Sequence, residues 1–151
     1  MENTQIRIIT LPAMRVASAL GFGKEPEYIA WDKILTFVKE KDLMQSTPAP
    51  RFFGFNNPDP SAGSPNYGYE QWVTVGPDIQ AEGEIKLHDF PGGLYAVLRC
   101  ESIPNPDIWR KLLVWLETSG YRMGRHQWLE ELLTPPGRDE WIFDLYLPIS
   151  K

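Results

Sequence analysis

Two adjacent glutamates near the C-terminus have the surroundings that could support chemistry. Glu130 and Glu131 occur in the segment HQWLEELL, directly after Trp128. Strand alternation puts Trp128 and Glu130 on one face and Glu131 on the other, so one of the two glutamates is expected to point inward. A buried carboxylate is costly unless a cation or a hydrogen-bond donor satisfies it. Two alternatives follow: a Lys, Arg or Tyr satisfies the carboxylate permanently, or the site is kept for a cationic ligand.

Aromatic residues are the second chemical feature, because they make up 13% of the chain and include six Trp. Trp31 and Trp109 lie near the starts of two similar predicted helices, and Tyr67 and Trp141 open two similar predicted strands. Rings at equivalent positions of a repeat are expected to meet at one seam. With one acid, such a seam predicts a cation–π cage, in which each ring stabilises a bound cation by about 0.5–2 kcal/mol. Packing in the core is the alternative role for these four rings.

The sequence contains none of the common cofactor or hydrolase motifs. GxGxxG, Walker, HExxH and GxSxG patterns are absent, so dinucleotide, nucleotide, zinc-protease and α/β-hydrolase functions have no motif support. His88 and His126 lack the paired spacing of a metal site, and we expect them to make ordinary hydrogen bonds. Cys100 alternates with apolar residues and is interpreted as a buried structural thiol. The sequence predicts no cofactor and no metal.

Charge and hydropathy narrow the class of partner. The formal net charge is -5 at pH 7, and the basic residues are scattered along the chain. Because phosphate contacts dominate affinity for nucleic acids, direct DNA binding is not expected, whereas an acidic field suits a cationic ligand. No run of about 18 apolar residues indicates a membrane span, and the N-terminus lacks the pattern of a signal peptide. The interpretation is a cytoplasmic protein.

An internal repeat organises the whole chain. IRIITLP at 6–12 is similar to IKLHDFP at 85–91, and WDKILTFV at 31–38 is similar to WRKLLVWL at 109–116. The two offsets are 79 and 78 residues, so the order and spacing of the segments are shared. This duplication predicts two strand–helix–strand–strand units at about 5–76 and 83–150. Because neither unit can bury its own sheet face, we expect them to share one core.

The predicted elements of each unit follow from periodicity and from turn residues. Apolar residues at helical spacing, such as Ala30, Ile34 and Phe37, predict the first helix. Asn105 as N-cap and Gly120 at the C-terminus delimit the second helix. Further strands are predicted at 51–55, 67–75, 127–133 and 141–149, with loops NNPDPSAGSPN and TPPGRD between them. The predicted fold is α+β, a pseudo-twofold pair of units with an antiparallel sheet, two helices and a central ligand cleft.

These segments in this order resemble the GyrI-like small-molecule-binding domain. The resemblance is carried by FFGFNNPDP, YGYEQWVTV, FPGGLYAVLRCE, SGY, HQWLEELL and DLYLPI, and it spans about residues 6–149. This family is the effector-binding module of multidrug-responsive MerR- and AraC-type regulators, and it also occurs alone. The resemblance implies the duplicated architecture and binding of amphipathic, often cationic aromatic compounds. The chain has no helix-turn-helix in addition to this module, so gene control is expected to need a partner chain.

The resemblance also assigns roles to individual residues. The family's buried ligand-sensing glutamate falls on Glu130, with Glu131 as the alternative if the register shifts by one residue. The tyrosine of the family's G-x-Y-A segment corresponds to Tyr95. Aromatic residues early in the first helix and at the start of the last strand correspond to Trp31 and Trp141.

Three functions are compatible with these observations. The leading hypothesis is a stand-alone module that binds a cationic aromatic compound through Glu130 and the rings of Trp31, Tyr95, Trp109 and Trp141. Further residues are expected to extend the wall of the site: Tyr67, Tyr69 and Phe55. The second hypothesis is a hydrolase of electrophilic small molecules in which Glu130 acts as general base. The third is an inhibitor that acts on a macromolecular partner.

Overall fold

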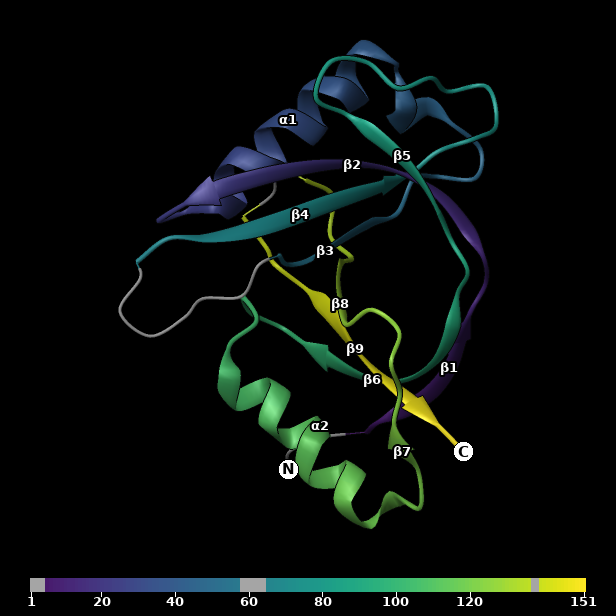
Figure 1. The fold of residues 1–151 in the computed structure, drawn as a ribbon, viewed down its shortest axis with the longest axis vertical. Coiled ribbons are helices and arrows are strands. Elements are labelled where there is room, and N and C mark those ends of the chain that lie inside the picture. The colour runs from purple at the N-terminus through teal and green to yellow at the C-terminus, as the bar shows by residue number, and fades with distance from the viewer. Residues whose placement is uncertain (1–4, 58–64, 137–138) are drawn as a thin grey trace. The chain divides into compact units, whose positions relative to one another are not determined.

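The computed structural model describes residues 5–57, 65–136 and 139–151, and the chain forms two compact units (Figure 1). Unit 1 contains residues 1–13 and 91–151, and unit 2 contains residues 14–90. Each unit has one α-helix and a set of antiparallel strands, which confirms the predicted α+β class. The two predicted loops at 56–66 and 134–139 lie partly outside the described residues.

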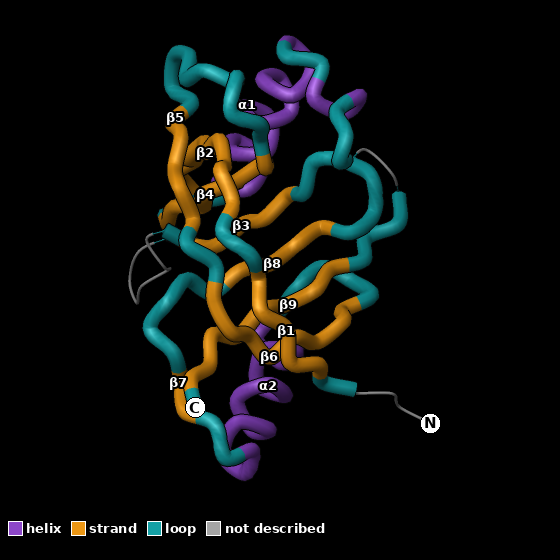
Figure 2. Tube along the Cα trace, turned by 90° about the vertical axis from the view of Figure 1, so that its right-hand side faces the viewer, coloured by secondary structure: helices purple, strands orange, loops and turns teal. Residues whose placement is uncertain are grey.

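Unit 2 is a four-stranded antiparallel sheet with one long helix. The strand order is β3-β4-β2-β5, and α1 lies beside β2 and β4 (Figures 1 and 2). The predicted apolar face of α1 is confirmed, because Ala30, Ile34 and Phe37 are all buried. The elements of this unit are β2 (Met14–Gly23), α1 (Pro26–Glu40), the 3-10 helix η1 (Leu43–Gln45), β3 (Phe52–Asn56), β4 (Tyr67–Thr74) and β5 (Lys86–Phe90).

A glycine in β2 lets α1 lie close to the sheet. A Cβ atom at Gly21 would lie 2.2 Å from the carbonyl oxygen of Pro26 and 2.8 Å from the backbone nitrogen of Ala30. Gly21 is paired with Tyr69 of β4, so both residues belong to the face that α1 covers. Residues that alternate with them, such as Leu20 and Glu70, belong to the face opposite α1.

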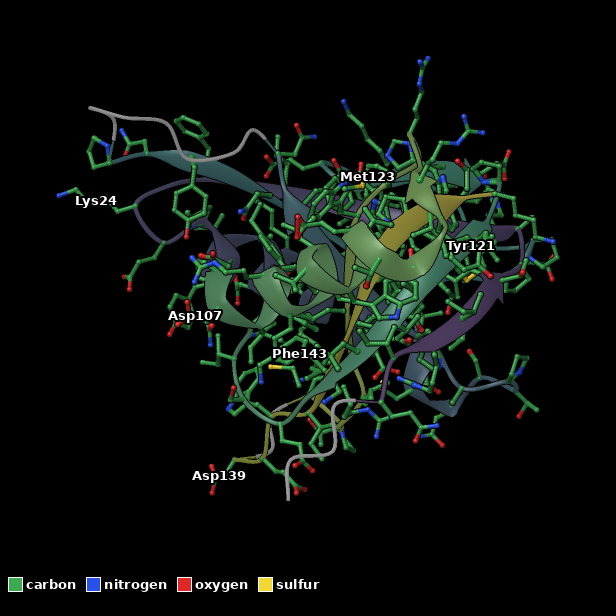
Figure 3. The ribbon with its side chains drawn as sticks, turned by 90° about the horizontal axis from the view of Figure 1, so that it is seen from below. Lys24, Asp107, Tyr121, Met123, Asp139 and Phe143 are labelled. Carbon is green, nitrogen blue, oxygen red and sulfur yellow. The ribbon has the colours of Figure 1, made fainter. Side chains whose placement is uncertain are left out.

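Unit 1 likewise contains one α-helix and antiparallel strands. Its strand order is β1-β6-β9-β8, and the short strand β7 pairs with the end of β9. Figure 3 looks onto α2, which begins near Asp107 and ends just before Tyr121, with the strands of the unit behind it. The elements are β1 (Arg7–Leu11), β6 (Gly93–Cys100), α2 (Pro106–Ser119), β7 (Arg122–Met123), β8 (Leu129–Leu132) and β9 (Phe143–Ser150).

Both ends of α2 have the caps that the sequence predicts. The Asn105 side chain accepts hydrogen bonds from the backbone N–H groups of Asp107 and Ile108, at 3.0 and 3.2 Å. Gly120 ends the helix in the left-handed region at φ 84°. Leu112 is the fully buried residue of α2, whereas the other residues of its apolar face are half-buried. Compared with α1, the helix α2 therefore depends more on its caps and less on buried apolar residues.

Each unit contains one strand from the other repeat of the sequence. β1, from the first repeat, pairs with β6 of the second repeat, whereas β5, from the second repeat, pairs with β2 of the first. The chain therefore crosses between the units twice, at residues 12–13 and at residues 91–92. The repeat units of the sequence and the compact units of the fold thus differ by an exchange of edge strands.

Two further features of the described residues bear on function. Cys100 is buried, as predicted, and its Sγ donates a hydrogen bond to the carbonyl oxygen of Ser102 at 3.2 Å. Within the described part of the chain, no helix is long and apolar enough to cross a membrane.

Candidate functional site

Glu131 is a buried carboxylate on the last two strands of unit 1. β8 and β9 are antiparallel, with Glu131 paired with Asp144 and Leu129 paired with Tyr146. These four residues therefore share one face of the sheet. The Glu131 side chain is 5% exposed, and its Oε1 accepts a hydrogen bond from the Tyr146 hydroxyl at 2.7 Å. The Tyr146 hydroxyl thus stabilises this buried carboxylate through a hydrogen bond.

Glu130 lies on the other face of β8. It is paired with Leu145 and is half-buried. Trp128, directly before β8, contacts Trp109 of α2 with a distance of 5.3 Å between ring centroids. Because Trp128 and Glu130 alternate with Glu131, Glu130 lies on the side of α2 and Glu131 on the face opposite α2. Which of the two glutamates binds a ligand stays a prediction.

Tyr95 lies between Tyr146, the hydrogen-bond donor of Glu131, and His126. The Tyr95 ring stands edge-on to Tyr146 at 5.4 Å between centroids, and edge-on to His126 at 4.8 Å. Tyr95 is fully buried, its hydroxyl donates to the carbonyl oxygen of Gln127 at 2.5 Å, and burial raises the pKa of this hydroxyl above its usual range. Tyr95 is therefore a buried aromatic residue whose hydroxyl stays neutral.

Two glycines make room for the ring of His126. A Cβ atom at Gly93 or at Gly124 would lie 2.6 Å from a carbon of this ring. The Nε2 atom of His126 lies 2.7 Å from the carbonyl oxygen of Leu94, so this nitrogen carries the proton and donates it. As predicted, His126 makes a structural hydrogen bond.

Asp144 forms a charged cluster that the sequence analysis missed. Its side chain is buried, and its Oδ1 accepts hydrogen bonds from Arg7 Nη2 and Arg99 Nε, both at 2.7 Å. The hydrogen bond to Asp144 raises the pKa of the Arg99 guanidinium. The sequence did contain an indication of this cluster, because Arg7 and Arg99 each occur in an otherwise apolar strand. Their common partner could not be identified, because β1, β6 and β9 are far apart along the chain.

Glu70 is the matching acid of unit 2 and was also missed as a site residue. It lies on β4, and its two oxygens accept hydrogen bonds from Asn57 Nδ2 at 3.0 Å and from Trp72 Nε1 at 2.7 Å. His88 Nε2 lies 3.8 Å from the same carboxylate and 2.8 Å from the hydroxyl of Ser18. In the sequence analysis Glu70 occurs only within the segment YGYEQWVTV and has no assigned role.

The other predicted site residues lie in separate contacts. In unit 1, Trp141 precedes β9, is 41% exposed and stacks on Phe143 at 6.3 Å between centroids. In unit 2, Trp31 lies 5.5 Å from the ring of Phe52, and the Tyr67 hydroxyl donates to Glu27 at 2.6 Å.

The remaining two predicted residues, Phe55 and Tyr69, are buried in unit 2. Phe55 stands edge-on to Trp72 at 5.2 Å, and the Tyr69 hydroxyl lies against Gly54. Of the nine predicted residues, the structure links Tyr95 and Glu131 through Tyr146. A cage that combines rings of both units stays a prediction.

The chemistry available to these groups is that of a carboxylate among aromatic rings. Such a site can bind a cation or accept a proton. Across residues 5–57, 65–136 and 139–151, no group of three or more His, Cys, Asp or Glu side chains could hold a metal ion.

The Cass2 family model, described as integron-associated effector binding protein, matches residues 7–149. No curated protein sequence matches the chain significantly.

Several solved structures share the fold. The EcmrR C-terminal domain has a TM-score of 0.71 and 17% identity, with 98% of each chain covered. In an EcmrR–DNA complex, with the same TM-score and identity, 97% of this chain matches but only 57% of the EcmrR chain is spanned. A hydrolase from Listeria innocua has a TM-score of 0.66 and 14% identity, covering 99% and 94% of the two chains. SAV2435 bound to tetraphenylphosphonium has a TM-score of 0.57 and 11% identity, covering 97% and 94%.

Proposed function

The chain belongs to the family of integron-associated effector-binding proteins, and on this premise we propose that it binds an amphipathic, cationic aromatic compound. Binding of a small molecule is the general function of an effector-binding protein. The proposal concerns the class of that molecule and the residues that recognise it.

The observation that carries the proposal is the buried carboxylate of Glu131 among aromatic rings. A buried carboxylate that accepts a hydrogen bond from the Tyr146 hydroxyl offers an anionic group that a positively charged guest can complement. The rings of Tyr95 and Tyr146 stand beside it and offer π-electron density to the same guest. Glu131 is therefore our preferred ligand-sensing acid, in place of its neighbour Glu130.

A structural neighbour supports the choice of ligand class. SAV2435 shares the fold and is bound to tetraphenylphosphonium, a lipophilic aromatic monocation. The net charge of -5 favours the approach of such a cation to this chain.

The remaining predicted rings are not part of this proposal, because they lie in contacts separate from Glu131. Trp31, Trp109 and Tyr67 are half-buried and Trp141 is 41% exposed, so each has surface left for a further contact.

The test compares two ions of nearly equal size and opposite charge, tetraphenylphosphonium and tetraphenylborate, by isothermal titration calorimetry. We expect micromolar binding of the phosphonium and at least tenfold weaker binding of the borate, because about 1.4 kcal/mol of charge discrimination is tenfold in affinity. Glu131→Gln keeps the acceptor for Tyr146 and removes the charge, so it should weaken phosphonium binding about tenfold.

Glu130→Gln is the matched control, because it makes the same change one residue away on the face toward α2. Equal binding of both ions, or an unchanged affinity in Glu131→Gln, would show that this carboxylate does not select the ligand. A larger effect of Glu130→Gln would assign the role to Glu130.

Hydrolysis is the second candidate function, and the shared fold of the hydrolase from Listeria innocua favours it. In that case the Glu131 carboxylate would take a proton from water while the water oxygen attacks an electrophilic carbon. The bond from that carbon to its leaving oxygen or nitrogen breaks, and the leaving atom takes up the proton. Product in excess of the protein, formed by the wild type and not by Glu131→Gln, would distinguish turnover from binding.

A further inference from the structure

The two repeats carry an acid at equivalent positions of their last strands. Glu70 and Asp144 are 74 residues apart in similar segments, YEQW and FDLY. In both units the acid lies on the sheet face opposite the unit's own helix. The surroundings of the two carboxylates can therefore be compared position by position.

In unit 1 the carboxylate is neutralised by the protein itself. Arg99 of β6 is paired with Asp144 across the strands, and Arg7 of β1 reaches the same oxygen from the next strand. Two guanidinium groups at 2.7 Å leave no net negative charge for a ligand at this position.

In unit 2 the two arginine positions are occupied differently. Leu20 of β2 is paired with Glu70, so it takes the place that Arg99 has beside Asp144. Lys86 of β5 takes the place of Arg7, and among the described residues it forms no ion pair with Glu70. The donors to Glu70 are the neutral amide of Asn57 and the neutral indole of Trp72. The carboxylate is thus positioned by these hydrogen bonds, and the other basic group near it is the His88 imidazole, whose Nε2 lies 3.8 Å away.

Exposed apolar side chains adjoin this charge on the same face. Leu20 is 48% exposed, and Phe22, two residues further along β2, is 58% exposed. The Glu70 side chain itself is 15% exposed. Phe55 of β3 is paired with Glu70 from the other side and is buried against Trp72. A carboxylate next to exposed leucine and phenylalanine complements a guest that is both positively charged and apolar.

We propose that Glu70, Leu20 and Phe22 form a cation-binding surface of unit 2 for an organic monocation with an apolar body. Glu70 supplies the countercharge, and the two exposed side chains cover the apolar body. This inference takes the ligand class from the proposed function and does not require that Glu131 binds the ligand.

The closing experiment uses the Trp72 indole as a local reporter. Its N–H donates to Glu70 Oε2, so a cation bound at this carboxylate should shift the indole resonance in a ¹H–¹⁵N spectrum. The resonance is assigned with Trp72→Phe, and tetraphenylphosphonium is the probe. We expect a saturable shift in the wild type, no saturable shift in Glu70→Gln, and about tenfold weaker calorimetric affinity for that variant.

A variant copied from the other repeat gives the sharper test. Leu20→Arg places a guanidinium where Arg99 stands beside Asp144, so it should neutralise Glu70 and weaken phosphonium binding about tenfold or more. Leu20→Met is the matched control, because it keeps an apolar side chain of similar size and should retain the affinity. Thermal unfolding of each variant reports whether the fold is intact.

The outcomes separate this inference from the proposed function. If the wild type binds phosphonium while Glu70→Gln and Leu20→Arg bind it equally well, the surface in unit 2 is refuted and the proposed function stands. If the wild type binds no phosphonium and the Trp72 resonance does not move, both are refuted. Loss of binding in Leu20→Arg with retention in Leu20→Met would support the inference.

Discussion

At the scale of single residues, Asp144 is a buried acid that is held by two charge-assisted hydrogen bonds. Asp144→Asn removes the negative charge that both Arg7 and Arg99 contact at 2.7 Å. Because the two arginine side chains are partly exposed, water compensates part of the loss. We expect the free energy of unfolding to fall by about 2 kcal/mol, within the range for hydrogen bonds to charged groups. Urea denaturation of the variant and the wild type measures this change.

A double-mutant cycle gives the control for this prediction. Arg99→Ala should be destabilising in the wild type and much less so in the Asp144→Asn background, because its partner charge is then absent. Equal effects of Arg99→Ala in both backgrounds would mean that the guanidinium stabilises the fold by packing alone.

The candidate acids show what a sequence can say about single residues. Alternation along HQWLEELL correctly put Glu130 and Glu131 on opposite faces, but it could not tell which face lies toward α2. That information depends on the pairing of β8 with β9, and on Tyr146, which is 15 residues from Glu131. The partners of the other two acids also come from strands distant in sequence. Asp144 contacts two arginines, whereas Glu70 accepts hydrogen bonds from neutral donors.

At the scale of elements, the close contact between α1 and β2 depends on Gly21. In Gly21→Ala the new methyl group would lie 2.2 Å from a backbone oxygen of the helix, so the start of α1 must shift. We expect a loss of about 2 kcal/mol in the free energy of unfolding, as for overpacked cores. Gly76→Ala is the matched control, because no atom lies within 4 Å of a Cβ atom there, and its effect should stay within about 0.5 kcal/mol. Similar midpoints for both variants in thermal unfolding would contradict the role given to Gly21.

Elements with local signals were predicted well. Asn105 and Gly120 cap α2 as expected, since a cap depends on residues within one helical turn. The last strand was predicted to begin at Trp141, whereas β9 begins at Phe143, because the limits of a strand depend on where its partner strand ends. The short strand β7 has too few residues for any periodicity to show.

At the scale of the whole molecule, the repeat alone could not reveal that the units exchange their edge strands. β1 is as compatible in sequence with β2 as with β6, because the two repeats are similar, and the choice of partner is non-local. The consequence is that neither repeat holds all the strands of one unit: the first repeat lacks β5, and the second lacks β1.

Separate expression of the two repeats tests this architecture. Cutting between Ala81 and Glu82 costs little locally, because the nearby ion pairs Lys33–Glu84 and Lys41–Glu82 involve exposed carboxylates. Alone, fragment 1–81 should leave the edge of β2 open and fragment 82–151 the edge of β6, so each should aggregate or stay unfolded. Mixed in equal amounts during refolding, they should form a 1:1 complex with the circular dichroism spectrum of the intact chain. Cooperative unfolding of either fragment by itself would show that the exchanged strand is dispensable, whereas complementation would mean that the two repeats fold only as a pair.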